Sequence, residues 1–162
     1  MKYDVFLQLQ NGELTKAEGE SDQAFMERIF REAFSEEPDA MSNRIFNILC
    51  PRFAGCDAGA KSLSVAFTAA DWMLNPQDTL HGGILSTALD MTMSTLGRCV
   101  KCVRGIATVQ LSINFIRPIP AGAEFVVTAA ADHVGRRSVA IRAEVHDAAS
   151  GKLVATASGV FM

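Results

Sequence analysis

One long stretch of the chain carries almost no charge, and this feature constrains the fold more than any other. No Lys, Arg or Glu occurs between Asp78 and Arg98. In a helix, at about 100° per residue, six small or polar residues of this stretch share one narrow stripe, and apolar residues fill most of the remaining circumference. The stripe contains Gly83, Ser86, Thr87, Asp90, Ser94 and Gly97. Because a helix that is apolar over most of its circumference is buried, we predict a buried central helix over 83–96, ended by Gly97 and Arg98.

Asp90 lies at the centre of the stripe. A carboxylate inside apolar surroundings either takes up a proton or needs dedicated hydrogen-bond donors. Such a group in a cleft is suited to act as a general base or nucleophile. The alternative is that Asp90 accepts hydrogen bonds from nearby Ser and Thr hydroxyls and is only structural.

The start of the predicted helix provides a second candidate element. Its first N–H groups lack intrahelical acceptors and lie at the positive end of the helix dipole. Gly82 and Gly83 leave them accessible, so they could polarise a carbonyl, or the glycines could simply form a tight entry into the helix. Gly82 and Asp90 are eight residues apart, which is about 12 Å along a helix. Since one carbonyl cannot easily touch both within one chain, the spacing predicts a homodimer with shared sites.

Other segments alternate apolar and polar residues with the period of a β-strand. The predicted strands cover residues 61–68, 108–115, 124–132, 138–146 and 153–161. The short turns between the later strands predict an antiparallel meander. Together with the long apolar helix, these strands predict an α+β fold in which the sheet wraps around the helix.

The N-terminal part has a different pattern. Residues 3–10 have strand-like apolar content, Ser21 is a candidate N-cap for a helix over 22–36, and a short helix is predicted over 42–49. We divide the chain into an N-terminal extension of unknown role, residues 1–40, and a main domain, residues 41–162.

Composition excludes several classes of protein. A chain of 162 residues has the length of one domain, at about 150 residues per domain. A net charge of −3 argues against nucleic acid as a partner. The longest segment without charged residues, 105–116, is too short to cross a membrane, and polar residues interrupt any signal-peptide core near the N-terminus. We therefore expect a cytoplasmic protein.

The cysteines do not form a metal-binding pattern. Cys99 and Cys102 have CxxC spacing but follow the predicted helix end, and Cys50 and Cys56 have the wrong spacing for the other half of a zinc ribbon. We expect ordinary reduced thiols and no metal. The sequence also lacks a P-loop and a GxGxxG motif, so we expect no nucleotide cofactor.

The order and spacing of several motifs resemble the PaaI-like branch of the hotdog-fold acyl-CoA thioesterases. The resemblance covers about residues 42–162. The matching segments are NPQDTLHGG over 75–83, Asp90 nine residues after His81, TVQLSINFIRP over 108–118, Gly122, Gly135-Arg136 and SGKLVA over 150–155.

The resemblance implies a hotdog fold and the hydrolysis of an acyl-CoA by a homodimer or a dimer of dimers. Asp90 would act as general base or nucleophile, and the Gly82 N–H of the partner subunit would polarise the thioester carbonyl. The other implied site residues are Asn75 and Thr108, near the attacking water, and His81, Gly83, Arg117 and Arg136, which would bind substrate. Asp78 stands where the family often has glycine, so the resemblance leaves the shape of this loop open.

Two other functions remain possible from the sequence. One is a non-catalytic protein of the same fold that binds an acyl-CoA or another apolar ligand. The other is a hotdog dehydratase, although the expected catalytic histidine with its Pro-rich surroundings is missing, and the histidine of this region, His81, instead opens the helix with two glycines. A thioester favours hydrolysis without a general acid, because a thiol has a pKa of about 8.5 and leaves as thiolate.

Overall fold

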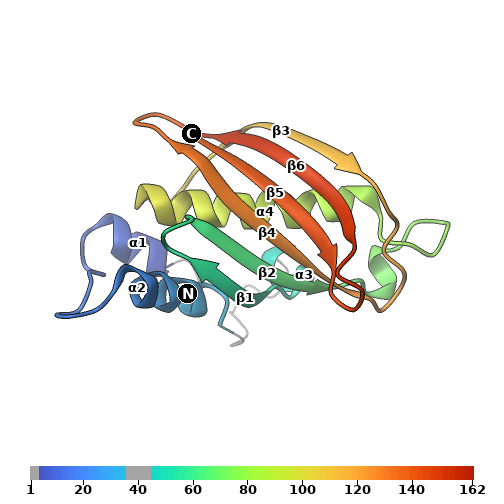
Figure 1. The fold of residues 1–162 in the computed structure, drawn as a ribbon, viewed down its shortest axis with the longest axis horizontal. Helices are drawn as coiled ribbons and strands as arrows, with labels where there is room; N and C mark the ends of the chain where they lie inside the picture. The colour runs from blue at the N-terminus through green and yellow to red at the C-terminus, as the bar shows by residue number, and fades with distance from the viewer. Residues whose placement is uncertain (1–3, 36–44) are drawn as a thin grey trace.

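A computed structural model describes residues 4–35 and 45–162 of the chain (Figure 1). Its centre is a six-stranded antiparallel sheet with the strand order β1-β2-β4-β5-β6-β3. The sheet wraps around one long helix, α4 (Gly82–Lys101) (Figure 1). The strands are β1 (Arg52–Asp57), β2 (Ser62–Thr68), β3 (Thr108–Phe115), β4 (Glu124–Val134), β5 (Val139–Asp147) and β6 (Leu153–Phe161). The predicted α+β architecture is therefore confirmed.

Alternation of side chains explains how the sheet packs on α4. In β5, Val139, Ile141, Ala143 and Val145 are buried, whereas Arg142 and Glu144 between them are exposed. β4 and β5 extend to Val134 and Asp147, beyond the predicted ends, with a short turn between them in which the Gly135 N–H donates to the Ser138 carbonyl at 2.9 Å. β1 was not predicted, because a register shift between Phe53 and Gly55 breaks its alternation.

Helix α4 is longer than predicted, and the expected end at Gly97 is wrong. The helix continues to Lys101, and Cys102 ends it in the left-handed conformation, with φ 52°. Gly97 instead lies in a tightly packed place, since a Cβ added there would lie 3.1 Å from Ile106 Cδ1. The CxxC pair consequently spans the last turn of the helix rather than following it. The four cysteines are free, and burial raises the pKa of the Cys99 thiol to about 12.

The N-terminal helices pack onto this core. Residues 3–10 were predicted to be strand-like, but α1 (Asp4–Gln10) is a helix, and it buries Val5, Phe6 and Leu9 on one face. In α2 (Asp22–Ala33) the predicted N-cap is confirmed, because Ser21 Oγ accepts the Ala24 N–H at 3.1 Å. α2 ends before the predicted residue 36.

The remaining short helices are α3 (Ile45–Leu49) and η1 (Asp71–Met73), a turn of 3₁₀ helix. The first three residues of the helix predicted over 42–49, and the boundary proposed at residue 40, lie outside the described part of the chain. The division into extension and main domain stays a prediction. No helix in the described ranges is both long enough and apolar enough to span a membrane.

Candidate active site

The tip of α4 leaves one backbone donor open. His81 is the N-cap, and its Nδ1 accepts the Gly83 N–H at 2.9 Å. Its carbonyl accepts the N–H groups of Ile84 and Leu85 at 2.9 and 3.1 Å. The Leu85 bond is the first ordinary helical one. Of the first four N–H groups, which a helix leaves without intrahelical partners, those of Gly83 and Ile84 are bonded to His81, and that of His81 donates to the Met73 carbonyl at 2.9 Å. The fourth of these groups, the N–H of Gly82, has no hydrogen-bond acceptor within residues 4–35 and 45–162.

The loop before this helix is shaped by Asn75. Its Oδ1 accepts the N–H groups of Gln77 and Thr79 at 2.9 and 3.2 Å, and its Nδ2 donates to Thr79 Oγ1 at 3.0 Å. Asp78 lies in this loop with φ 55°. This is the left-handed conformation that glycine adopts freely and that Asp tolerates better than most residues. The loop therefore reaches a glycine-like conformation at Asp78 although the residue is not glycine.

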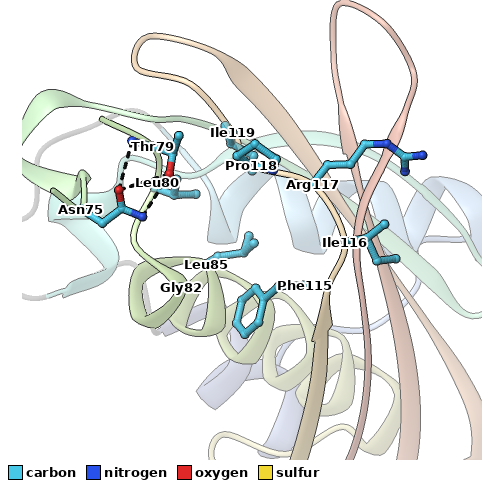
Figure 2. A pocket seen from close by; sticks show the side chains of 10 residues that line it. All are labelled: Asn75, Thr79, Leu80, Gly82, Leu85, Phe115, Ile116, Arg117, Pro118 and Ile119. Carbon is cyan, nitrogen blue, oxygen red and sulfur yellow. Dashed lines mark hydrogen bonds between the residues drawn. The ribbon is translucent and has the colours of Figure 1, made fainter. Parts of the chain in front are cut away.

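A pocket of about 300 Å³ opens beside the tip of α4 (Figure 2). Gly82 and Asn75 lie at its wall together with mostly apolar side chains. Arg117 also contributes to the wall, but its guanidinium points away from Gly82 and donates to the Leu153 carbonyl at 2.6 Å (Figure 2). The lining residues are Asn75, Thr79, Leu80, Gly82, Leu85, Phe115, Ile116, Arg117, Pro118 and Ile119.

Asp90 lies about two turns further along α4 and contacts the start of β3. Thr108 Oγ1 donates to Asp90 Oδ1 at 2.6 Å. The prediction that Asp90 is buried is wrong for the single chain, in which this residue is half-buried. Most of the helix after Asp90 is buried, as predicted. The neighbouring hydroxyls of the stripe do not donate to Asp90. Ser86 donates to the Gly82 carbonyl, and Thr87 donates to the Gly83 carbonyl.

The predicted site residues therefore form three groups. Asn75, His81, Gly82, Gly83 and Arg117 gather around the helix tip and its pocket, and Asp90 pairs with Thr108. Arg136 is separate: it lies in the turn between β4 and β5, where Lys101 Nζ donates to the carbonyls of Gly135 and Arg136 at 2.6 and 3.0 Å. The roles of all these residues stay predictions.

Sequence reasoning missed Phe115, which lines the pocket and lies against Gly82. The alternation of β3 placed Phe115 on the same face as Leu111 and Ile113, where it reads as an ordinary sheet residue. Its position at the strand end, directly before the Ile116-Arg117-Pro118 turn, was the one available signal. In the part of the chain that the structure covers, no group of His, Cys, Asp or Glu is arranged to hold a metal ion.

Comparison with known proteins gives consistent results. Residues 77–154 match the sequence model of the thioesterase superfamily. A phenylacetic acid degradation-related protein of Ralstonia eutropha is 28% identical, with a TM-score of 0.68 over 82% of this chain and 97% of that one. The PaaI protein of Escherichia coli is 24% identical, with a TM-score of 0.64 over 76% and 83% of the two chains. A Streptococcus mutans protein bound to acetyl CoA shares the fold at 20% identity and a TM-score of 0.61, over 68% and 85%.

Proposed function

Since residues 77–154 match the thioesterase superfamily and the chain has the hotdog fold of the PaaI-like thioesterases that it resembles, we propose that it hydrolyses acyl-CoA thioesters as a homodimer. One observation carries this proposal: two groups suited to thioester hydrolysis lie at opposite ends of strand β3. At its first residue, Thr108 holds the Asp90 carboxylate. At its last residue, Phe115 lies against Gly82, whose N–H is an open donor.

Strand β3 can bring these two elements together between chains. It lies at one end of the sheet and pairs only with β6, so its other edge has no partner strand within the described chain. When two copies of β3 pair antiparallel over their whole length, the first residue of one strand lies beside the last residue of the other. Thr108 of the partner subunit then lies beside Phe115, whose ring contacts Gly82.

Such a dimer supplies both parts of a thioesterase site from different subunits. The Gly82 N–H of one subunit, at the positive end of the α4 dipole, binds the thioester oxygen and stabilises the negative charge that develops on it. Asp90 of the partner subunit reaches the carbonyl carbon from the other side, and the hydroxyl of Thr108 of the partner subunit orients it. The same contact would cover Asp90, which is half-buried in the single chain.

The chemistry can follow two routes at this site. As a general base, Asp90 takes a proton from water, whose oxygen attacks the carbonyl carbon; the tetrahedral intermediate then breaks its C–S bond, and the thiolate leaves with the C–S electron pair. As a nucleophile, Asp90 forms an anhydride with the acyl group and expels the thiolate first; water then hydrolyses the anhydride. Neither route needs a strong acid, because the leaving thiolate is stable near neutral pH.

The other predicted residues have supporting roles in this proposal. His81 fixes the helix tip through its bond to Gly83, and Asn75 fixes the loop that leads to it. Arg117 and Arg136 are exposed cations that could meet the phosphates of CoA, and Lys101 holds the turn that carries Arg136.

The test is complementation between two inactive variants. Asp90→Asn should lower kcat by about 10²–10⁴, the range for loss of an acid–base group. Gly82→Pro removes one N–H, and proline is well tolerated at the first position of a helix; its kcat should fall by about 10²–10³. Gly82→Ala is the matched control, because it keeps the N–H and its Cβ would meet the Phe115 ring at an ordinary 3.4 Å.

Mixing the two variants decides whether the site is shared. Half of randomly mixed dimers are heterodimers, and each has one intact site, so about a quarter of the wild-type activity should return. If both parts of the site came from the same chain, mixing would restore nothing. If the wild-type protein binds acyl-CoA in a thermal-shift assay but releases no thiol, it is instead a binding protein of the same fold.

A further inference from the structure

Phe115 has an unusual position for an aromatic side chain. It is the last residue of β3 and is 57% exposed. Its ring nevertheless lies against the tip of α4, where a Cβ added to Gly82 would be 3.4 Å from Cζ and 3.5 Å from Cε1 (Figure 2). The ring therefore lies next to the residue whose N–H has no acceptor among the described residues.

The backbone around Phe115 is fixed by the sheet. Phe115 pairs with Ala155 in β6. The next two N–H groups, of Ile116 and Arg117, both donate to the Val154 carbonyl at 2.8 and 3.0 Å. These bonds hold the chain directly after Phe115, and the pairing of Asn114 with Thr156 holds it directly before. The backbone position of Phe115 therefore follows from strand pairing and does not depend on a flexible loop.

The ring also forms one wall of the pocket of about 300 Å³. The polar side chains of this wall are engaged elsewhere, since Asn75 bonds Thr79 and Arg117 bonds the Leu153 carbonyl. The Arg117 guanidinium also points away from Gly82 (Figure 2). At the helix tip the available polar group is therefore the Gly82 N–H, which has no acceptor among the described residues. The remaining walls are apolar, from Leu80, Leu85, Ile116, Pro118 and Ile119. An apolar group that carries a carbonyl fits this arrangement, and the acyl end of a thioester is such a group.

We propose that Phe115 is a specificity-determining residue that sets the size of the acyl group. The inference rests on the proposed function. With the carbonyl oxygen at the Gly82 N–H, the acyl chain enters the pocket along the ring, which limits its length. An apolar protein cavity of about 150 Å³ accommodates benzene, so this pocket of about 300 Å³ has room for an acyl group of at least that size.

The test measures kcat/KM for straight-chain acyl-CoA thioesters of increasing length. Phe115→Ala enlarges the pocket and should move the preferred chain length upward, with a gain of roughly fourfold for each further methylene that becomes buried. Phe115→Trp should move it downward. Phe25→Ala is the matched control: this aromatic side chain is half-buried on α2, outside the pocket, and its loss should leave the preferred length unchanged.

The outcomes separate this inference from the proposed function. If both Phe115 variants lower kcat/KM by the same factor for every chain length, the ring is only structural and the inference is wrong. If the wild-type protein hydrolyses no CoA thioester, the proposed function fails. The same length series can then be read as shifts in unfolding temperature on acyl-CoA binding, and identical profiles for wild type and Phe115→Ala would overturn the inference as well.

Discussion

The two edge strands of the sheet, β1 and β3, differ in whether other segments of the chain cover them. At the β1 edge, Gln23 on α2 donates to the Cys56 carbonyl at 2.8 Å and accepts the Ala58 N–H at 2.8 Å. Phe53 in β1 stacks on Phe30, with ring centroids 6.2 Å apart. The guanidinium of Arg31 lies over the Phe53 ring, 5.1 Å from its centroid. Side chains of the N-terminal segment thus occupy this edge.

The β3 edge has no such cover among the described residues. Val109 and Phe115 are 56% and 57% exposed, and the strand carries the partner of Asp90 at one end and the contact to Gly82 at the other. An uncovered edge strand readily pairs with another chain. The difference between the edges fits the proposed dimer, since side chains of the N-terminal helices occupy the β1 edge, whereas the β3 edge, at which Thr108 and Phe115 lie, is left available for pairing.

Among changes away from Asp90 and Gly82, the largest expected effect comes from blocking the β3 edge. Lysines discourage edge pairing, so Ser112→Lys combined with Asn114→Lys, two exposed positions, should give a monomer by gel filtration. Thioesterase activity should fall by about 10²–10³, the cost of losing one oxyanion donor. The matched variant at the other edge, Gln23→Ala, should stay dimeric and active and lose about 1–2 kcal/mol of unfolding free energy. A fully active monomer would contradict the shared site.

A smaller effect is expected from the hydroxyl that holds Asp90. Thr108→Val removes the donor at 2.6 Å, and a hydrogen bond to a charged group contributes about 1.5–3 kcal/mol, so kcat should fall tenfold to a hundredfold. Thr128→Val is the control, since its hydroxyl bonds Ser64 in the sheet, outside the site. Equal losses of kcat in both variants would show that a general change in the sheet, rather than the site, causes the effect.

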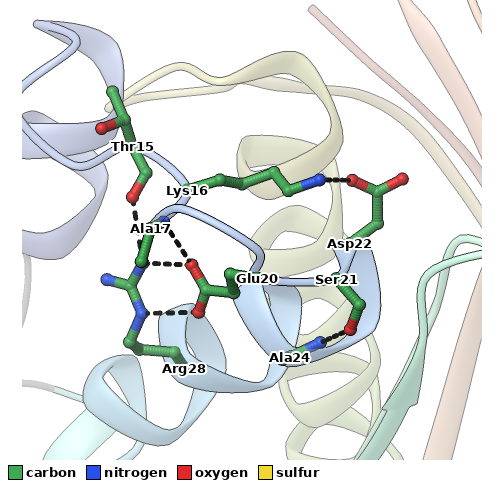
Figure 3. A network of polar contacts seen from close by, with 8 residues as sticks. All are labelled: Thr15, Lys16, Ala17, Glu20, Ser21, Asp22, Ala24 and Arg28. Atoms are coloured by element: carbon green, nitrogen blue, oxygen red, sulfur yellow. Dashed lines mark hydrogen bonds and ion pairs between the residues drawn. The ribbon is translucent and has the colours of Figure 1, made fainter.

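The smallest effect concerns the N-terminal segment that closes β1. Arg28 pairs with Glu20 through two bonds of 2.8 and 3.0 Å, and the Ala17 N–H also donates to Glu20 (Figure 3). The Arg28 pair, and then the Ala17 bond, lower the pKa of Glu20 from 4.5 to about 2. The ionised form therefore stabilises the fold above pH 4.5, and this contribution is lost as pH falls from 4.5 to 2.

Urea unfolding across that range measures the contribution. Glu20→Gln should lower the urea midpoint modestly at pH 5 and should have a flatter pH profile than the wild type below pH 4.5. Because this network lies on α2 and the loop before it, and not at the β3 edge, hydrolysis at neutral pH should be unchanged. Parallel profiles for the two proteins would show that the pair contributes no measurable stability.

Local patterns predicted part of this molecule well. The bounds of β3 and β6 agree with the period-two alternation, and the Ser21 cap was visible as a residue type at a helix start. α1 was misread because a short apolar segment can fit either a strand or a helix. Gly97 was read as a helix end because a glycine needed for close packing has the same local appearance as one that terminates a helix.

The candidate site likewise contains residues that the sequence indicated and contacts that it could not indicate. Asp90 and Gly82 were singled out by residue type and helical spacing, and Thr108 by resemblance. The sequence could not indicate that the Arg117 guanidinium bonds the Leu153 carbonyl, or that Phe115 covers the helix tip. Both contacts depend on how β3 and β6 are aligned, which no short segment encodes.

By itself, the sequence determined a long helix with a glycine tip, no Lys, Arg or Glu before Arg98, and a single carboxylate on a stripe of small residues, because helical periodicity is a property of neighbouring residues. The tertiary structure decided which N–H of the tip stays open, which hydroxyl reaches Asp90 from 18 residues away, and which edge of the sheet is covered. These features depend on strand register and on packing between distant segments, and the folded chain alone fixes them.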